Sequence, residues 1–384
     1  MDESVPGASA PETFDARPLQ QRARRRRWVA AVVAASVVVV LVGSFWRLPY
    51  YTLSPGSLRN TTSLISVEGA PTYTDDGDLG YLTVSFAQAT PFFLLRAWVD
   101  DDIEVLDEEA ALGGRDLEEN REVNARLMDN AKETATAVAL DALGYDVRLL
   151  GTGAAIVTVE PGTPAEGLLE PGDVVVGIDG VPVSTSVELT DGIVARPVGT
   201  TVVLDVERHD AAALTPEGAS PQPVVEEVAI TLAARPDDPT LAYLGVRSGT
   251  RDATWDLPFE VSVDSGNVIG PSAGLAFTLG IIDVLTPGSL TGGEVVAVTG
   301  TITPRGDVGV VGGVSQKAAA AIGAGASVYL VPEVELGAAE ERAGGAMDVV
   351  GVTTLLDALD ALAAITGDRS VVDLVSTNLA DEVP

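Results

Sequence analysis

The sequence contains no cysteine, one histidine and only two lysines among its 384 residues. Without cysteine there is no disulfide bond, no thiolate metal ligand and no cysteine nucleophile, and either redox compartment is permitted. A serine–histidine arrangement would depend on His209 alone, which is followed by Asp210. Arginine supplies all the other basic residues, and with a pKa above about 12 it cannot act as a base. Bases for chemistry near neutral pH are therefore scarce.

One of the two lysines, Lys317, lies downstream of Ser272, which stands in the sequence Gly-Pro-Ser-Ala-Gly at 270–274. A serine nucleophile needs a base for its proton, and a lysine can serve if burial lowers its pKa. Residues 312–321 are mostly small and apolar and include no carboxylate. The two residues together predict a serine–lysine hydrolytic dyad. A GC-rich genome would explain the scarcity of lysine and a helix N-cap would explain the serine, but each explains only one member of the pair.

Three linked motifs surround the predicted dyad. In chain order they are Asp-Ser-Gly-Asn-Val-Ile-Gly-Pro-Ser-Ala-Gly at 264–274, Thr-Gly-Thr-Ile-Thr-Pro-Arg-Gly at 299–306 and Gly-Gly-Val-Ser-Gln-Lys at 312–317. Together they resemble the proteolytic domain of the protease Lon, over roughly residues 257–367. The resemblance implies Ser272 as the nucleophile, Lys317 as the general base and Thr299 as a residue that helps to orient the lysine. It also implies a ring-shaped homo-oligomer, a trimer or a hexamer.

The sequence departs from the Lon pattern at two positions near the predicted dyad. Thr301 stands where the family usually has an acidic residue, and Ser315 stands where it usually has a lysine. Neither change removes Ser272 or Lys317. The phosphate-binding motif Gly-x-x-x-x-Gly-Lys-[Ser/Thr], which belongs to the ATPase part of Lon, does not occur in this sequence. We therefore expect a peptidase that binds no nucleotide, no other cofactor and no metal ion.

The residues around Ser272 predict how an oxyanion is held. A strand over 259–263 leads through a loop into a helix that begins near Ser272 and ends near Val284. Proline fits the start of such a helix because its missing N–H is not needed there. Main-chain N–H groups at a helix N-terminus, and the positive end of the helix dipole, suit a developing negative charge. We assign this supporting role to the backbone from Gly270 to Ala273.

From Trp28 to Trp46 the chain runs for 19 residues without a charge, after Arg22 and four consecutive arginines at 24–27. At 1.5 Å per residue a helix of this length spans about 28 Å, close to the hydrocarbon thickness of a bilayer. The alternatives are a buried core helix and a cleaved signal peptide, whose apolar stretch would be shorter and would end at a small-residue cleavage site. We predict a single-pass helix in the cell membrane, with the arginines cytoplasmic and all later residues outside the cytoplasm.

The net charge of −33 is unevenly distributed. Residues 1–27 contain six arginines and four acidic residues, whereas residues 28–384 contain 17 basic and 52 acidic residues. A body this acidic is repelled by nucleic acid and by anionic lipid surfaces. We therefore expect no nucleic-acid partner, and solubility alone accounts for the excess of acidic residues.

Residues from about 144 to 208 contain three turn and strand signals, which are a Pro-Gly-Thr-Pro-Ala turn at 161–165, a Leu-Glu-Pro-Gly-Asp strand entry at 169–173 and an Asp-Gly hairpin turn at 179–180. With these features the segment resembles a PDZ domain of the type found in bacterial proteases. Strands are predicted over 156–159 and 201–207, and a helix over 186–195.

A PDZ domain binds an extended peptide by adding it as a strand to the edge of a sheet. We expect the groove between the strand around Val157 and the helix over 187–194. The turn at 150–153, with Leu150 and Gly151, is the predicted binding site for a peptide carboxylate. A purely structural spacer is the alternative role for this domain.

Residues 52–143 contain less specific signals. Alternating apolar residues over 81–86 predict a strand, and 118–143 has helical spacing with many acidic residues. We expect this region to pack against the PDZ-like domain. The Pro-, Gly- and Ser-rich stretch 214–223 is predicted to be a long loop or a linker.

These observations predict a multidomain α/β (α+β) protein with one transmembrane helix, a β-rich PDZ-like domain and a C-terminal Lon-like α/β domain. The predicted segments are 1–27 (cytoplasmic), 28–46 (transmembrane helix), 47–143 (extracytoplasmic α+β region), 144–235 (PDZ-like domain), 240–368 (Lon-like domain) and 369–384 (tail). The predicted function is an ATP-independent, membrane-anchored serine endopeptidase that cleaves unfolded or flexible polypeptides. The alternatives are a catalytically silent PDZ adaptor or assembly scaffold, and a protein that processes only itself.

Overall fold

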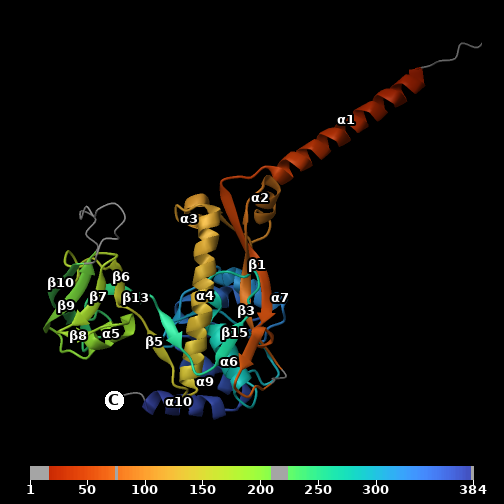
Figure 1. The fold of residues 1–384 in the computed structure, drawn as a ribbon. Helices are drawn as coiled ribbons and strands as arrows, with labels where there is room; N and C mark the ends of the chain where they lie inside the picture. Colours follow the sequence, from red (N-terminus) through yellow and green to blue (C-terminus); the bar gives the residue numbers. More distant parts are fainter. Residues whose placement is uncertain (1–16, 74–76, 209–223, 382–384) are drawn as a thin grey trace, which may run out of the picture. The chain divides into compact units, whose positions relative to one another are not determined.

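The computed structural model describes residues 17–73, 77–208 and 224–381 (Figure 1). His209, the predicted loop at 214–223 and residues 1–16 of the predicted cytoplasmic segment lie outside the described residues. The chain divides into two compact units, which are Met1–Gly56 with Val84–Leu117, and Ser57–Thr83 with Glu118–Pro384.

The first unit contains a long N-terminal helix and several short elements. They are α1 (Arg17–Phe45), α2 (Pro91–Ala97), β4 (Glu104–Asp107) and α3 (Glu108–Leu112), with one end each of β1 (Tyr50–Asn60) and β3 (Asp78–Gln88). β4 pairs antiparallel with β1, where Asp107 lies opposite Tyr50. Among the described residues, α1 is the one helix that is long and apolar enough to cross a membrane, over Trp28–Phe45.

The C-terminal domain is built on a sheet of order β20-β19-β16-β3-β1-β4. Its C-terminal strands are β16 (Val295–Val298), β19 (Val328–Pro332) and β20 (Asp348–Val352). These three strands and β3 run parallel to one another. Every residue of β19 is buried, as expected for a parallel strand that is covered on both faces.

Within 52–143, residues 57–83 and 118–142 contribute to this C-terminal domain and residues 84–117 belong to the first unit, whereas we expected the whole region to pack against the PDZ-like domain. β3 pairs with β16, with Tyr81 opposite Val298. The long helix α4 (Leu117–Ala142) contributes Met128 and Leu140 to the same hydrophobic core. The physical reason is that β16 without β3 would leave a hydrophobic parallel strand as an exposed edge.

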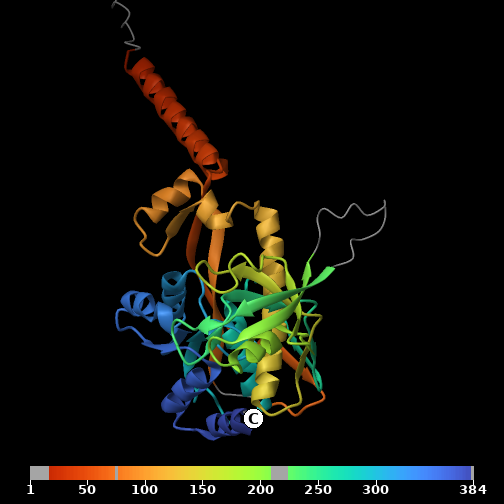
Figure 2. The same cartoon turned by 90° about the vertical axis from the view of Figure 1, so that its left-hand side faces the viewer.

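Helix α6 (Gly274–Leu285) forms the centre of this domain, and all of its residues are buried. Phe277 on α6 meets Tyr81 edge to face, with ring centroids 5.3 Å apart. The helices that follow are α7 (Val314–Gly323), α8 (Leu336–Ala343), α9 (Leu355–Thr366) and α10 (Ser370–Asp381). The predicted C-terminal tail is therefore largely helical. Asn378 Nδ2 donates a hydrogen bond to Ala142 O at 3.0 Å, so α10 is tied to the end of α4, as Figures 1 and 2 both show.

The PDZ-like domain has a hydrophobic core of its own. Its sheet has the order β10-β9-β7-β6-β13, with β8 paired to β7. The elements are β6 (Ala154–Val159), β7 (Val174–Ile178), β8 (Val181–Pro182), α5 (Ser186–Val194), β9 (Thr201–Arg208), β10 (Val224–Thr231) and β13 (Val246–Thr250). The predicted strands and helix are confirmed, and Asp179 has the positive φ, +52°, that an Asp-Gly hairpin turn requires. The last strand, β13, lies beyond the predicted boundary at residue 235.

Four pairs of short strands complete the fold. They are β5 (Arg148–Leu150) with β14 (Thr254–Asp256), β2 (Ile65–Glu68) with β15 (Glu260–Val263), β17 (Thr301–Ile302) with β18 (Val308–Gly309), and β11 (Ala233–Ala234) with β12 (Ala242–Tyr243). β15 is the strand predicted before the serine motif. The chain is thus a multidomain protein of mixed helix and strand, as predicted.

Candidate active site

Lys317 lies in the second turn of α7 and is almost completely buried, with 2% of its surface exposed. The helix begins after Gly313, whose φ of +68° is a left-handed value that favours glycine. Ala318 and Ala321 of the same helix are fully buried, so the predicted apolar setting of the lysine is confirmed. Lys317 Nζ donates a hydrogen bond to Thr299 Oγ1 at 2.9 Å.

Burial lowers the pKa of Lys317 to about 8, from an ordinary value of 10.5, because the charged amine loses its hydration. The carboxylate of Glu335 opposes this effect through its negative charge. Glu335 ends the 3-10 turn η3 (Glu333–Glu335) that follows β19, and its Oε2 accepts a hydrogen bond from Val311 N–H at 3.1 Å. Burial raises the pKa of Glu335 itself. Near pH 8 a large fraction of Lys317 is therefore neutral and able to accept a proton.

Thr299 connects Lys317 to the main chain of Ser272. Its side chain is fully buried directly after β16. Thr299 Oγ1 accepts the bond from Lys317 and donates one to Ser272 O at 3.2 Å. The same carbonyl oxygen accepts a hydrogen bond from Gly300 N–H at 3.0 Å, and Thr299 N–H donates to Leu330 O on β19, also at 3.0 Å. The hydrogen bond to β19 thus holds Thr299, and with it the link between Lys317 and Ser272, in a fixed position on the sheet.

Ser272 lies in the 3-10 turn η2 (Pro271–Ala273), directly before α6. The helix was predicted to begin near Ser272, and α6 begins two residues later, directly after this turn. The tighter turn comes first because the chain enters it through Gly270 with φ +100°, a value that glycine tolerates, and because Pro271 fixes the next φ. Gly270 N–H donates to Asn124 O on α4 at 2.9 Å. This predicted oxyanion donor is therefore engaged within the protein.

The fold brings together the residues that the motifs predicted for the site. Ser272, Thr299 and Lys317 come from η2, from the end of β16 and from α7, and hydrogen bonds join them in that order. These bonds reach Ser272 through its main-chain carbonyl, which fixes the backbone that bears the hydroxyl. In the part of the chain that the structure describes, no group of three or more His, Cys, Asp or Glu side chains is placed to hold a metal ion.

A groove in the PDZ-like domain lies between α5 and β13. Leu189 and Ile193 line it from α5, and Val246 and Ser248 line it from β13. β13 is the last strand of its sheet and is paired with β6 on its other side. An edge strand beside a helix is the setting in which an extended peptide can add as a further strand.

The strand predicted to border this groove is one position further inside the sheet. Val157 lies on β6, which pairs with β13 from Ala154 to Val159. The groove has no lining residue from β6. The prediction was wrong because β13, which occupies the peptide side of β6, comes from a part of the sequence about 90 residues later.

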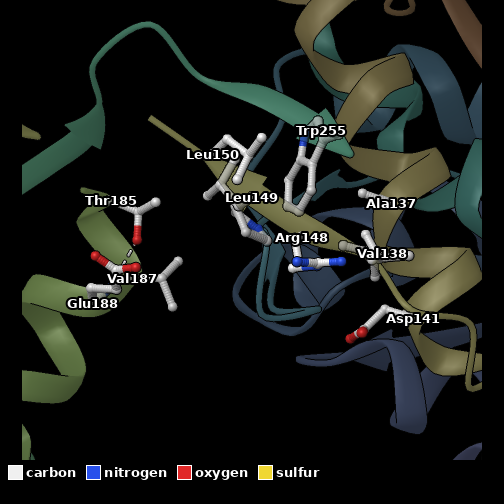
Figure 3. A pocket seen from close by; sticks show the side chains of 12 residues that line it. Ala137, Val138, Asp141, Arg148, Leu149, Leu150, Thr185, Val187, Glu188 and Trp255 are labelled. Atoms are coloured by element: carbon white, nitrogen blue, oxygen red, sulfur yellow. Dashed lines mark hydrogen bonds between the residues drawn. The ribbon is translucent and has the colours of Figure 1, made fainter. Parts of the chain in front are cut away.

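Two main-chain donors of the turn at 150–153, which was predicted to bind a carboxylate, are engaged within the protein. After Gly151, Thr152 N–H donates to Arg251 O and Gly153 N–H donates to Ser184 O, each at 2.9 Å. Leu150 lines a different hollow, between α4, β5 and the start of α5 (Figure 3).

Figure 3 shows this hollow with Arg148 pointing from β5 toward α4, below the ring of Trp255. Val138 and Asp141 line it from α4. Its lining does not include Ser272, Thr299 or Lys317. The hollow is therefore not part of the candidate active site.

Two family models match the chain once the site is described in this way. Residues 141–215 match the PDZ domain, and residues 258–360 match the Lon protease (S16) C-terminal proteolytic domain. Neither match includes an ATPase domain. The chain thus contains a PDZ domain and a Lon-type proteolytic domain, which define a protease with a peptide-binding domain.

Several solved structures resemble one quarter of the chain. The PDZ domain of an SdrC-like protein from Listeria innocua is 26% identical, with 25% of this chain and 92% of that chain covered and a TM-score of 0.20. The corresponding domain from Listeria monocytogenes is 23% identical, with 25% and 87% covered and a TM-score of 0.19. A protein from Geobacillus thermodenitrificans is 28% identical, with 25% and 95% covered and a TM-score of 0.20.

Proposed function

We propose that this protein is a membrane-anchored serine endopeptidase that hydrolyses unfolded or flexible polypeptides without ATP. The observation that supports the proposal most strongly is the buried Lys317, whose pKa is about 8. Its Nζ donates a hydrogen bond to Thr299, which in turn donates one to the main chain of Ser272. Burying an amine that is charged at pH 7 costs folding stability. A structural role alone does not explain why a lysine is present here, whereas a catalytic base requires it.

In the proposed reaction, neutral Lys317 takes the proton from Ser272 Oγ as that oxygen attacks the carbonyl carbon of the scissile bond. The bond to the leaving nitrogen then breaks, and the lysine gives its proton to the leaving amine. A water molecule, deprotonated by the same lysine, hydrolyses the acyl-enzyme and regenerates Ser272. Thr299 keeps Nζ in place through these steps.

We assign the oxyanion to the main-chain N–H groups of Ser272 and Ala273. Gly270 N–H is a weaker candidate because it is bonded to Asn124 O. The turn η2 leads directly into α6, so the positive end of a buried helix dipole also points toward this position.

The groove between α5 and β13 is the proposed site for an extended stretch of polypeptide. Main-chain hydrogen bonds along β13 would supply affinity, and the apolar side chains of α5 would contact alternate residues of the peptide. Such a site can hold a flexible segment while the proteolytic domain cleaves the same chain.

Helix α1 is the proposed anchor. Its uncharged stretch follows a cluster of arginines, which favours a cytoplasmic N-terminus and places both domains outside the cytoplasm. A ring of three or six copies remains an expectation from the likeness to Lon, and analytical ultracentrifugation of the detergent-solubilised chain would measure it.

The direct test of this function is cleavage of casein by the full chain in detergent, without ATP, followed by gel electrophoresis. Accumulating casein fragments would support the proposal. Intact casein, with or without ATP, would contradict it and favour a silent adaptor. Shortening of the protein itself with no cleavage of casein would instead indicate self-processing.

Replacing Glu335 by glutamine is expected to move the rise of kcat/KM with pH to lower pH. The charge of Glu335 raises the pKa of Lys317, and glutamine removes that charge but keeps an oxygen acceptor for Val311 N–H. Because the neutral lysine is the active form, activity rises as the pH passes the pKa of Lys317, so a lower pKa shifts the rise downward. Casein cleavage at a series of pH values measures the shift. The control is Glu333→Gln in the same turn, and identical profiles for both variants would contradict the role of Glu335.

Replacing Ser248 by phenylalanine is expected to raise KM for casein about tenfold, which corresponds to about 1.4 kcal/mol, with little change in kcat. The larger side chain fills the groove between β13 and α5 but lies outside the proposed catalytic site. Steady-state kinetics measures both constants. Val225→Phe introduces the same side chain at an exposed position on β10, the opposite edge of the sheet, and should leave KM unchanged. Equal KM values for the two variants would exclude this groove as the binding site.

A further inference from the structure

The short helix α2 presents an exposed apolar face. Thr90 caps the helix, with its Oγ1 accepting a hydrogen bond from Phe93 N–H at 3.3 Å. Leu95 is 60% exposed, and Trp98 and Val99, which follow the helix, are 81% and 73% exposed. Residues three and four positions apart lie on the same side of a helical segment. These three side chains, here called the α2 apolar face, are unusually large hydrophobic groups to leave in contact with water.

The structure fixes α2 beside the C-terminal end of α1, as Figures 1 and 2 show. The ring of Phe92 packs on the backbone of Gly43, where an added Cβ would lie 2.6 Å from Phe92 Cε2. Gly43 is buried, although most of the described side chains around it on α1 are exposed. Only glycine allows this close contact between the two helices.

Main-chain hydrogen bonds also tie the start of α2 to the segment that leaves α1. Leu48 N–H donates to Ala89 O at 3.0 Å, and Ala89 N–H donates to Tyr50 O at 2.8 Å. Arg47 Nη1 donates to Gln88 O at 3.3 Å. The position of α2 relative to the end of α1 is therefore set by packing and by hydrogen bonds together.

The end of α1 is where the proposed membrane span meets water. Phe45 and Trp46 are 79% and 61% exposed there, and tryptophan is enriched at the boundary between the hydrocarbon and the headgroups. Helix α2, which bears the α2 apolar face, lies next to this position. A lipid bilayer that covers α1 would therefore reach α2 as well.

We propose that α2 is a second membrane contact, which inserts Leu95, Trp98 and Val99 into the headgroup region of the bilayer that α1 crosses. The proposal rests on the membrane anchoring proposed above. Val99 is followed directly by three aspartates, 100–102, so the contact depends on apolar burial and not on attraction to anionic lipid. A neutral phosphatidylcholine bilayer is then sufficient, and the first unit is held against the membrane at two points.

The absence of cysteine allows a sharp test, because a single introduced cysteine takes up one nitroxide spin label. Full-length Leu95→Cys and Trp98→Cys proteins, labelled and placed in phosphatidylcholine vesicles, are compared for collisions with dissolved oxygen and with a water-soluble nickel chelate. Glu104→Cys, at an exposed position on β4 of the same unit, provides a label outside the α2 apolar face. Ala35→Cys within α1 reports on the anchor, and Val225→Cys on β10 reports on a site in water.

Labels at 95 and 98 are expected to collide with oxygen but little with nickel, at a depth of about 5–10 Å, while labels at 104 and 225 collide freely with nickel. Nickel access at 95 and 98 equal to that at 225, with position 35 shielded, would overturn the contact and leave the anchor intact. Nickel access at 35 would overturn the anchor and the contact together. Labels at 95 and 98 shielded from both reagents would show that protein covers this face, which also overturns the proposal.

Discussion

Replacing Ser272 by alanine is expected to reduce the cleavage of casein by at least about a thousandfold and to leave the fold unchanged. The substitution removes the proposed nucleophile, Ser272 Oγ. The half-buried turn keeps its main-chain bonds to Thr299 and Gly300 because these bonds use the carbonyl of residue 272. Initial rates of casein cleavage in detergent without ATP measure the loss, and circular dichroism checks the fold.

Ser315→Ala is the matched control for that experiment. Ser315 is also half-buried and lies two residues before the proposed base, on α7, but it has no role in the proposed reaction. We expect this variant to keep most of the wild-type rate. Undiminished cleavage by Ser272→Ala would show that another group performs the attack.

Replacing Lys317 by methionine is expected to stabilise the folded protein by about 3 kcal/mol below pH 8, while abolishing activity. The ordinary pKa of lysine, 10.5, and the folded value of about 8 differ by an amount that corresponds to about 3 kcal/mol. Between these pH values the unfolded chain binds more protons than the folded chain, so the wild-type free energy of unfolding rises with pH. The advantage of methionine is therefore complete below pH 8 and disappears as the pH approaches 10.5.

Urea denaturation of both proteins at a series of pH values measures this difference. The only other lysine, Lys132 on α4, provides the control. It is partly exposed and lies 3.4 Å from Asp129 on the helix surface, so Lys132→Met should change stability by less than about 1 kcal/mol at any pH. A methionine variant at 317 that is no more stable than wild type at pH 7 would contradict the low pKa of Lys317.

The proposed catalytic residues could be predicted from the sequence because each lies in a contiguous motif. Ser272, Thr299 and Lys317 are marked by their glycine-rich surroundings, and the hydrogen bonds among them agree with the motif order. Glu335 does not lie in a recognisable motif. It follows a buried strand in an ordinary acidic turn, and only the hydrogen bond that it accepts from Val311 N–H, in the loop before α7, places its charge near the lysine. A charge contributed through space by another element leaves no local pattern in the sequence.

The position of the peptide groove also depends on contacts between distant segments, which no local sequence pattern reveals. The strand at β6 was predicted correctly from the sequence, but strand order depends on pairing between distant segments. β13 pairs with β6 although Val246 and Val159 are far apart in the sequence. Likewise, β3 was recognised as a strand, yet its partner β16 lies beyond the whole PDZ domain. Periodicity shows that a strand has a buried face, but not which strand lies beside it.

Mass spectrometry of the full-length protein after treatment with a fluorophosphonate tests most directly whether Ser272 is a nucleophile activated by Lys317. This reagent forms a stable bond to an activated serine oxygen with loss of fluoride. We predict one adduct, on Ser272, that forms faster as the pH rises through about 8 and does not form in Lys317→Met. An adduct on a different serine, or equal labelling of Ser272 in Lys317→Met, would contradict the proposed dyad.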